Sequence, residues 1–124
     1  MPITIRFDRA KPMASVEFMI QGALPHYEVA KAQAEDRTEV QPLLTAPGFK
    51  RLVEDVRSAF ERRLTDTKFE LVQISGIICH DLNVYRPGIL LIVQEPGREG
   101  TIPEKGRERV TATAEAVRER LGMS

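Results

Sequence analysis

The chain has no tryptophan, a single cysteine and only two histidines among its 124 residues. One cysteine excludes an internal disulfide bond and a zinc site built from several thiolates. No stretch reaches the roughly 18 consecutive apolar residues of a membrane span. No charged and then apolar leader opens the sequence either, so we expect a cytoplasmic protein without a membrane partner.

The chain also lacks an excess of charge of either sign, since 18 basic residues balance 18 acidic ones. Proteins that bind nucleic acid usually show a basic excess, so we expect no nucleic-acid partner. Internal repeats, low-complexity tracts and Gly/Ser/Pro linkers are absent as well. The length is that of one domain of about 100–150 residues. We therefore predict a single domain over residues 1–124.

Two short segments near the start of the chain alternate between apolar and polar residues. The apolar positions are Ile3, Ile5 and Phe7 in the first segment and Val16, Phe18 and Ile20 in the second. A period of two is typical of a half-buried strand. Lys11-Pro12 separates the segments, and their closeness predicts an antiparallel hairpin.

Two amphipathic helices are predicted from apolar residues spaced by three and four. The first stripe is Phe49, Leu52, Val53, Val56, Phe60 and Leu64, and the second is Val110, Ala114, Val117 and Leu121. Thr101 and Glu104 form a capping-box signature before the second helix, with Thr101 as its N-cap, and Gly122 fits the C-cap. A further helix with a thin apolar stripe is predicted over residues 25–41.

Between the two helices the sequence becomes rich in strand-forming residues. Phe69, Leu71, Val72, Ile74, Ile77 and Ile78 place apolar side chains on both faces of a first strand. A second strand begins at Val84 and is expected to be interrupted at Pro87-Gly88. It continues as the apolar run Ile89-Leu90-Leu91-Ile92-Val93, which requires cover on both faces.

The order β-β-(α)-α-β-β-α predicts an α+β fold: a mainly antiparallel four-stranded sheet with two main helices on one face. It is a cyclic permutation of the ferredoxin-like order β-α-β-β-α-β. Helices on one face leave the other face to be covered, and a second copy of the chain is the usual cover. We therefore expect a homo-oligomeric binding or assembly module without catalytic activity. Alternatively, residues 25–41 cover that face.

Pro2 is the candidate catalytic base. Met1-Pro2 followed by an alternating strand is similar to the tautomerase superfamily, in which an N-terminal proline is the base. The resemblance implies a tautomerase or isomerase with Pro2 as base and an arginine such as Arg6 or Arg86 beside it. It requires removal of Met1, because only a free amine, with a pKa near 8, can take up a proton near neutral pH. Unlike that family, this chain follows its first strand with a second strand.

The loop Gly97-Arg98-Glu99-Gly100-Thr101 is the candidate ligand-binding segment. Backbone N–H groups at a helix start, with Arg98 beside them, suit a small anion such as a phosphate. Arg98, Gly100 and Thr101 would bind it, which would make the chain a regulatory module for a phosphorylated small molecule. A plain connecting loop explains the same residues.

Cys79-His80-Asp81 has the residue types of a catalytic triad, but neighbours in a strand point to opposite faces. We interpret these residues as a buried thiol and a strand-end turn. His26 and His80 lack the close spacing typical of metal ligands. No metal and no cofactor are therefore expected.

Overall fold

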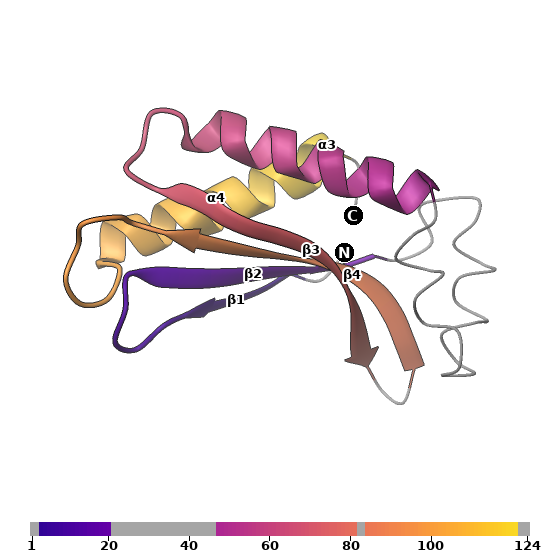
Figure 1. Cartoon of the computed structure of the whole chain (residues 1–124), viewed down its shortest axis with the longest axis horizontal. Coiled ribbons are helices and arrows are strands. Elements are labelled where there is room, and N and C mark those ends of the chain that lie inside the picture. Colours follow the sequence, from indigo (N-terminus) through magenta and orange to yellow (C-terminus); the bar gives the residue numbers. More distant parts are fainter. Residues whose placement is uncertain (1–2, 21–46, 82–83, 122–124) are drawn as a thin grey trace.

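The computed structural model describes residues 3–20, 47–81 and 84–121 of the chain. The elements follow in the order β1 (Ile3–Phe7), β2 (Met13–Met19), α3 (Pro47–Leu64), β3 (Glu70–Asp81), β4 (Val84–Gln94) and α4 (Glu104–Arg120). The strands form one antiparallel sheet in the order β1-β2-β4-β3, and both helices lie on the same face of it (Figure 1). The predicted α+β fold is confirmed. The helix predicted over residues 25–41 lies outside the described residues.

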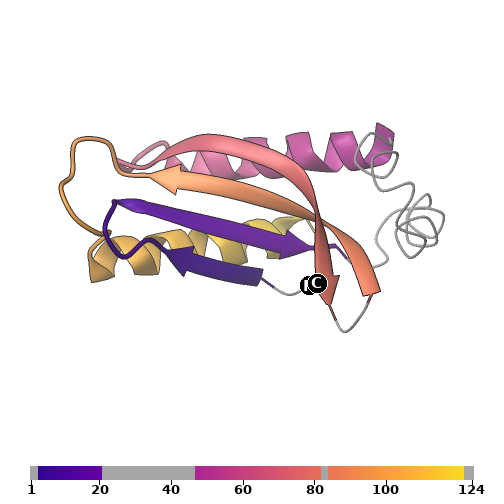
Figure 2. The same cartoon turned by 60° about the horizontal axis from the view of Figure 1, so that its bottom comes forward.

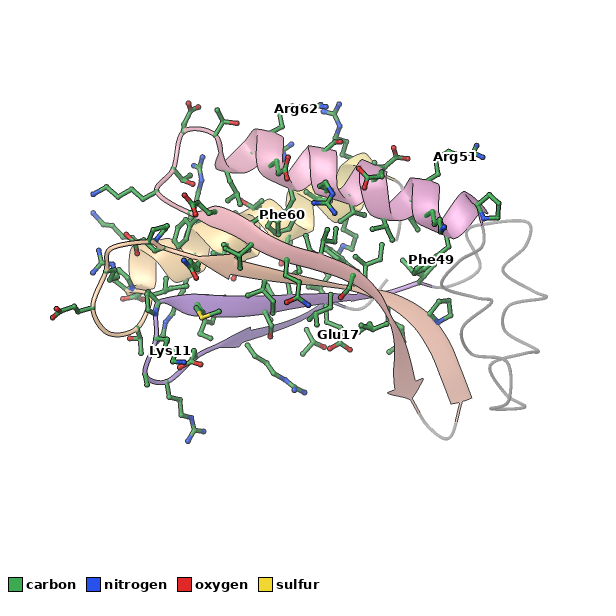
Figure 3. The ribbon with its side chains drawn as sticks, viewed as in Figure 1. Lys11, Glu17, Phe49, Arg51, Phe60 and Arg62 are labelled. Atoms are coloured by element: carbon green, nitrogen blue, oxygen red, sulfur yellow. The ribbon has the colours of Figure 1, made fainter. Side chains whose placement is uncertain are left out.

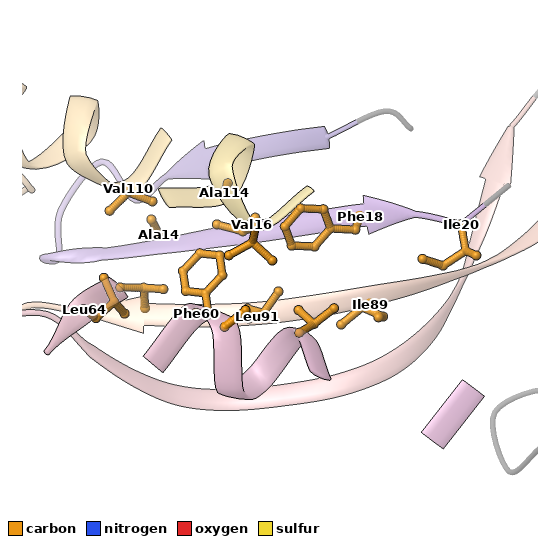
Figure 4. Close-up of a cluster of buried hydrophobic side chains, with 14 of the residues drawn as sticks. Ala14, Val16, Phe18, Ile20, Phe60, Leu64, Ile89, Leu91, Val110 and Ala114 are labelled. Atoms are coloured by element: carbon orange, nitrogen blue, oxygen red, sulfur yellow. The ribbon is translucent and has the colours of Figure 1, made fainter. Parts of the chain in front are cut away.

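The core lies between the sheet and the two helices (Figure 4). From the central strands and the residue that follows β2 it takes Ala14, Val16, Phe18, Ile20, Ile89, Leu91 and Val93, and from the helices Phe49, Val56, Ala59, Phe60, Leu64, Val110, Ala114 and Val117. Both predicted helical stripes are therefore confirmed. Leu52, Val53 and Leu121 are partly buried against this core. No helix within the described ranges is long and apolar enough to cross a membrane.

Helix α3 begins at Pro47, which suits a first helical position because proline lacks the N–H group that is unpaired there. Its end is fixed by Thr67. The N–H and hydroxyl groups of Thr67 both donate to the carbonyl oxygen of Leu64, at 3.0 and 2.7 Å. The Thr67 hydroxyl in turn accepts a bond of 3.1 Å from the N–H of Phe69. The last turn is thus closed before β3 begins.

The capping-box prediction for α4 is wrong. The helix begins at Glu104 with Pro103 as its N-cap, and no side chain caps it. Pro103 is extended, at φ −70° and ψ 167°. A residue that precedes proline disfavours the helical region, so Ile102 cannot be a first helical residue after Thr101. Ile102 is instead buried in the core, and Thr101 is only partly buried.

Strand β4 is not interrupted at Pro87-Gly88, contrary to the sequence prediction. The carbonyl oxygen of Pro87 accepts a bond of 2.9 Å from the N–H of Ile20, at the point where β2 ends. In an antiparallel ladder the N–H and C=O groups of one residue face the same neighbour. An N–H group at position 87 would therefore point to the end of β2 and not to β3. Its absence in Pro87 leaves the pairing of β4 with β3 intact.

Gly106 lies in the first turn of α4, close to the core. A Cβ atom at this position would lie 2.6 Å from Cγ2 of Ile102 and 2.9 Å from Cζ of Phe69. Both distances are too short for carbon atoms in van der Waals contact, which is optimal at about 3.5–4.0 Å. The helix therefore needs glycine here for packing.

We expect Gly106→Ala to lower the free energy of unfolding by about 1 kcal/mol, the cost of overpacking exceeding the gain in helix propensity. Urea denaturation would measure it. In an Ile102→Ala background the closest methyl group is gone and only the contact with Phe69 remains, so the same substitution should cost less than it does in the wild type. A stabilising effect of Gly106→Ala alone would contradict the packing described.

Candidate functional site

The candidate site is the face of the sheet opposite the helices, called here the helix-free face. No described helix crosses it (Figure 2). Because the buried side chains of β2 point toward the helices, the alternate residues point to the helix-free face. With their register partners, its residues are Thr4, Arg6, Met13, Ser15, Glu17, Met19, Gln73, Ser75, Ile77, Leu90, Ile92 and Gln94.

The helix-free face is apolar at Leu90 and Ile92 on β4 and mostly polar on either side of them. Leu90 and Ile92 lie on the central strand β4 and are only partly buried, whereas Leu91 between them is fully buried on the other face. The register places Glu17 and Ser75 on either side of Leu90. Alternate side chains of the apolar run in β4 thus pack in the core, and the side chains between them lie on the helix-free face.

A depression of about 210 Å³ lies at one end of this face, at the β1–β2 turn, and includes Arg6, Met13, Ser15 and Ile92 in its lining. Oδ1 of Asp8 accepts bonds of 2.8 and 2.9 Å from the N–H groups of residues 10 and 11. These bonds hold the turn and lower the pKa of the Asp8 carboxyl group below its usual value. Arg6, the arginine predicted to assist Pro2, is exposed here on β1.

The β3–β4 hairpin extends past the end of β2. The register of β2 with β4 ends at Met19 and Gly88, whereas β3 and β4 stay paired up to Asp81 and Val84. This two-stranded projection, called here the arm, bends away from the helices (Figure 1). A two-stranded ribbon by itself is marginally stable in water. The arm sequence nevertheless includes the apolar residues Ile78, Val84 and Tyr85.

Strand β3 contains a bulge at Val72. Leu71 pairs with Val93 and Gln73 with Ile92, so Val72 has no register partner. Val72 is 46% exposed, the only exposed large apolar residue within residues 3–20, 47–77 and 87–121. Bulges break the regular row of backbone groups on an edge strand, and β3 is an edge strand. The bulge therefore disfavours edge-to-edge pairing at this end of β3.

The loop predicted to bind an anion is organised around an internal ion pair. Nε of Arg98 lies 2.6 Å from Oε2 of Glu95, whose side chain is 10% exposed. Gly97 and Gly100 adopt φ values of 80° and 79°, which side-chain-bearing residues rarely adopt. The backbone thus accounts for both glycines, and the guanidinium group of Arg98 is already paired. Anion binding at Arg98, Gly100 and Thr101 stays a prediction.

The other predicted site residues are not brought together by described contacts. Pro2 and His26 lie outside the described residues, so the tautomerase hypothesis stays a prediction. Arg86 and the Cys79-His80-Asp81 segment lie in the arm, where the backbone is paired. No cluster of three or more His, Cys, Asp or Glu residues that could hold a metal ion occurs in the described ranges.

No protein-family model, curated protein or solved structure matches this chain significantly.

The arm and the bulge are features of the candidate site that the sequence did not predict. The arm had one signal in the sequence, because apolar residues after Ile77 continue the strand pattern beyond the length that pairing with the seven-residue β2 requires. The bulge had none, because Val72 looks like any other strand residue.

Proposed function

We propose that the chain is a homo-oligomeric binding or assembly module without catalytic activity of its own, and that a second copy binds to the helix-free face. The observation that carries this proposal is the partly buried apolar centre of that face, Leu90 and Ile92, on the central strand of the sheet. An apolar centre inside a polar rim is the common anatomy of a protein–protein interface.

Two further features favour a second copy over an unlike partner. The face carries charge of both signs, Arg6 and Glu17, and the chain has no net charge, so identical faces meet without net repulsion. The arm bends to the side of the helix-free face, where a bound copy would pack against it. Such a contact supplies the support that a two-stranded ribbon lacks alone.

The test is the oligomeric state in solution. Sedimentation equilibrium at micromolar concentration should give at least twice the chain mass of 14.0 kDa. Ile92→Asp should shift the mass to that of the single chain, since burying an unpaired carboxylate weakens association by roughly 100-fold or more. Ser58→Asp is the matched control, because it adds the same charge at an exposed position of α3.

A wild-type chain that sediments as a monomer would overturn the proposal and would favour cover of this face by residues 25–41. Equal dissociation by Ile92→Asp and Ser58→Asp would show that the interface lies elsewhere. Circular dichroism of both variants should match the wild type, because neither position belongs to the core.

A further inference from the structure

A second surface on the other side of the molecule carries an independent inference. A depression of about 250 Å³ lies between the C-terminal end of α3 and the middle of α4. It is lined by Arg62, Arg63, Asp66, Arg109, Ala112 and Thr113 and is called here the arginine pocket. Arg62 projects from α3 away from the sheet (Figure 3), so the pocket opens on the helix layer and not on the helix-free face.

The arginine pocket carries an excess of positive charge, because three arginines line it and Asp66 is its only carboxylate. Over residues 3–20, 47–81 and 84–121, no hydrogen bond or ion pair is formed by the side chains of Arg62, Arg63 or Arg109. Arg57 and Arg98, by comparison, are paired with Glu54 at 3.3 Å and with Glu95 at 2.6 Å. In a chain without net charge, three such cations around one depression with a single carboxylate form a local excess of positive charge.

The helix dipole explains only part of this cluster. Arg62 and Arg63 lie in the last turn of α3, where the partial negative charge of the helix end attracts cations. Arg109 is in the first half of α4, away from any helix C-terminus. It therefore gains nothing from a helix dipole, and the other two arginines raise the electrostatic cost of its charge. A bound anion removes that cost.

The chemistry of the lining restricts the anion. Each guanidinium group offers five N–H donors in a planar arrangement that matches the oxygens of a phosphate. The hydroxyl group of Thr113 already donates to the carbonyl oxygen of Arg109 at 2.8 Å, so the arginines supply the donors. Drug-sized ligands occupy pockets of about 300–1,000 Å³. The arginine pocket lies below that range and has room for a phosphate-sized group.

We propose that the arginine pocket binds the phosphoryl group of a small phosphorylated molecule, with the rest of that molecule in solvent. The loop over residues 97–101, which the sequence predicts to bind an anion, is a weaker candidate for binding this phosphoryl group. The depression beside it is lined by Lys68 and Arg98 but also by Glu95 and Glu99, so its charges cancel. The arginine pocket is the described depression in which cations outnumber carboxylates and stay unpaired.

The test is a titration of the full chain with inorganic phosphate at constant ionic strength, followed by ¹H–¹⁵N correlation spectra. We expect saturable shifts at the amides of Asp66, Arg109 and Thr113, with a midpoint of about 1 mM or below. Arg109→Gln and Arg63→Gln should each raise the midpoint roughly tenfold, since each removes one charge-assisted pair. Arg51→Gln is the matched control: it removes the same charge from the exposed start of α3 and should change the midpoint less than about twofold.

Four results would overturn the assignment. They are the absence of saturable shifts, equal shifts with chloride at the same ionic strength, equal affinity for succinate, and equal weakening by Arg51→Gln. The spectra also report whether each variant is folded. Repeating the titration on Ile92→Asp separates this proposal from the proposed function, because the arginine pocket should bind phosphate equally well in a dissociated chain.

Discussion

Phe60→Ala should lower the free energy of unfolding by about 3–5 kcal/mol, because it removes a fully buried ring and leaves a cavity. Phe60 projects from α3 to the centre of the core, between the helix layer and strands β2 and β4 (Figure 4). The helix cannot collapse onto the sheet to fill the space, because Val56 and Leu64 hold it one turn on either side. The loss is a large fraction of the roughly 5–15 kcal/mol that stabilises a typical domain.

Glu61→Ala is the control for this experiment. Glu61 is the next residue of α3 and is exposed, so its substitution should change stability by no more than about 0.5 kcal/mol. Guanidinium chloride melts of both variants provide the comparison. Losses of similar size would mean that α3 presents a different face to the sheet.

Leu91→Ala should cost about 2–5 kcal/mol, whereas Ile92→Ala, one residue further, should cost much less in the isolated chain. Leu91 is fully buried and pairs with Val16 on one side and Ile74 on the other, at the centre of the sheet. Ile92 points to the helix-free face and is only partly buried. Substitutions at these two neighbouring residues therefore test the packing of opposite faces of β4.

The readout separates folding from association. Urea melts at low chain concentration measure the stability of the single chain, and sedimentation measures the oligomer. Leu91→Ala should change mainly the first, and Ile92→Ala mainly the second. If Ile92→Ala destabilises the dilute chain as much as Leu91→Ala does, the helix-free face is packed within the chain and the proposed interface is wrong.

The sequence predicted the elements well because their periodicity reflects burial on one side. Ala14, Val16 and Phe18 are buried and their neighbours are not, which is the pattern that a period of two indicates. The stripe of α3 is correct for the same reason. Ala59 and Thr113 are buried although neither was predicted, because a small residue or a threonine with an internal hydrogen bond fits close to a core without a long apolar side chain.

Prediction from the sequence was incomplete where contacts between distant parts of the chain override a local pattern. Leu71 and Ile74 are three residues apart, which places them on opposite faces of a regular strand, yet both pack against the core. The bulge at Val72 shifts the alternation by one residue and brings them to the same side. The arginine pocket was equally invisible, because it joins residues on two helices that are more than 40 positions apart in the sequence.

The strand order has a consequence for how the chain is made. Strand β4 is the last strand to leave the ribosome, yet it lies between β2 and β3, and its register with β2 joins Met13 to Gln94. Until then β1 and β2 form a hairpin without a third strand, which is marginal in water. Contacts between residues so far apart in sequence also slow folding. The nascent N-terminal hairpin therefore exposes Val16 and Phe18 during most of synthesis, and this is when the chain is most prone to aggregate.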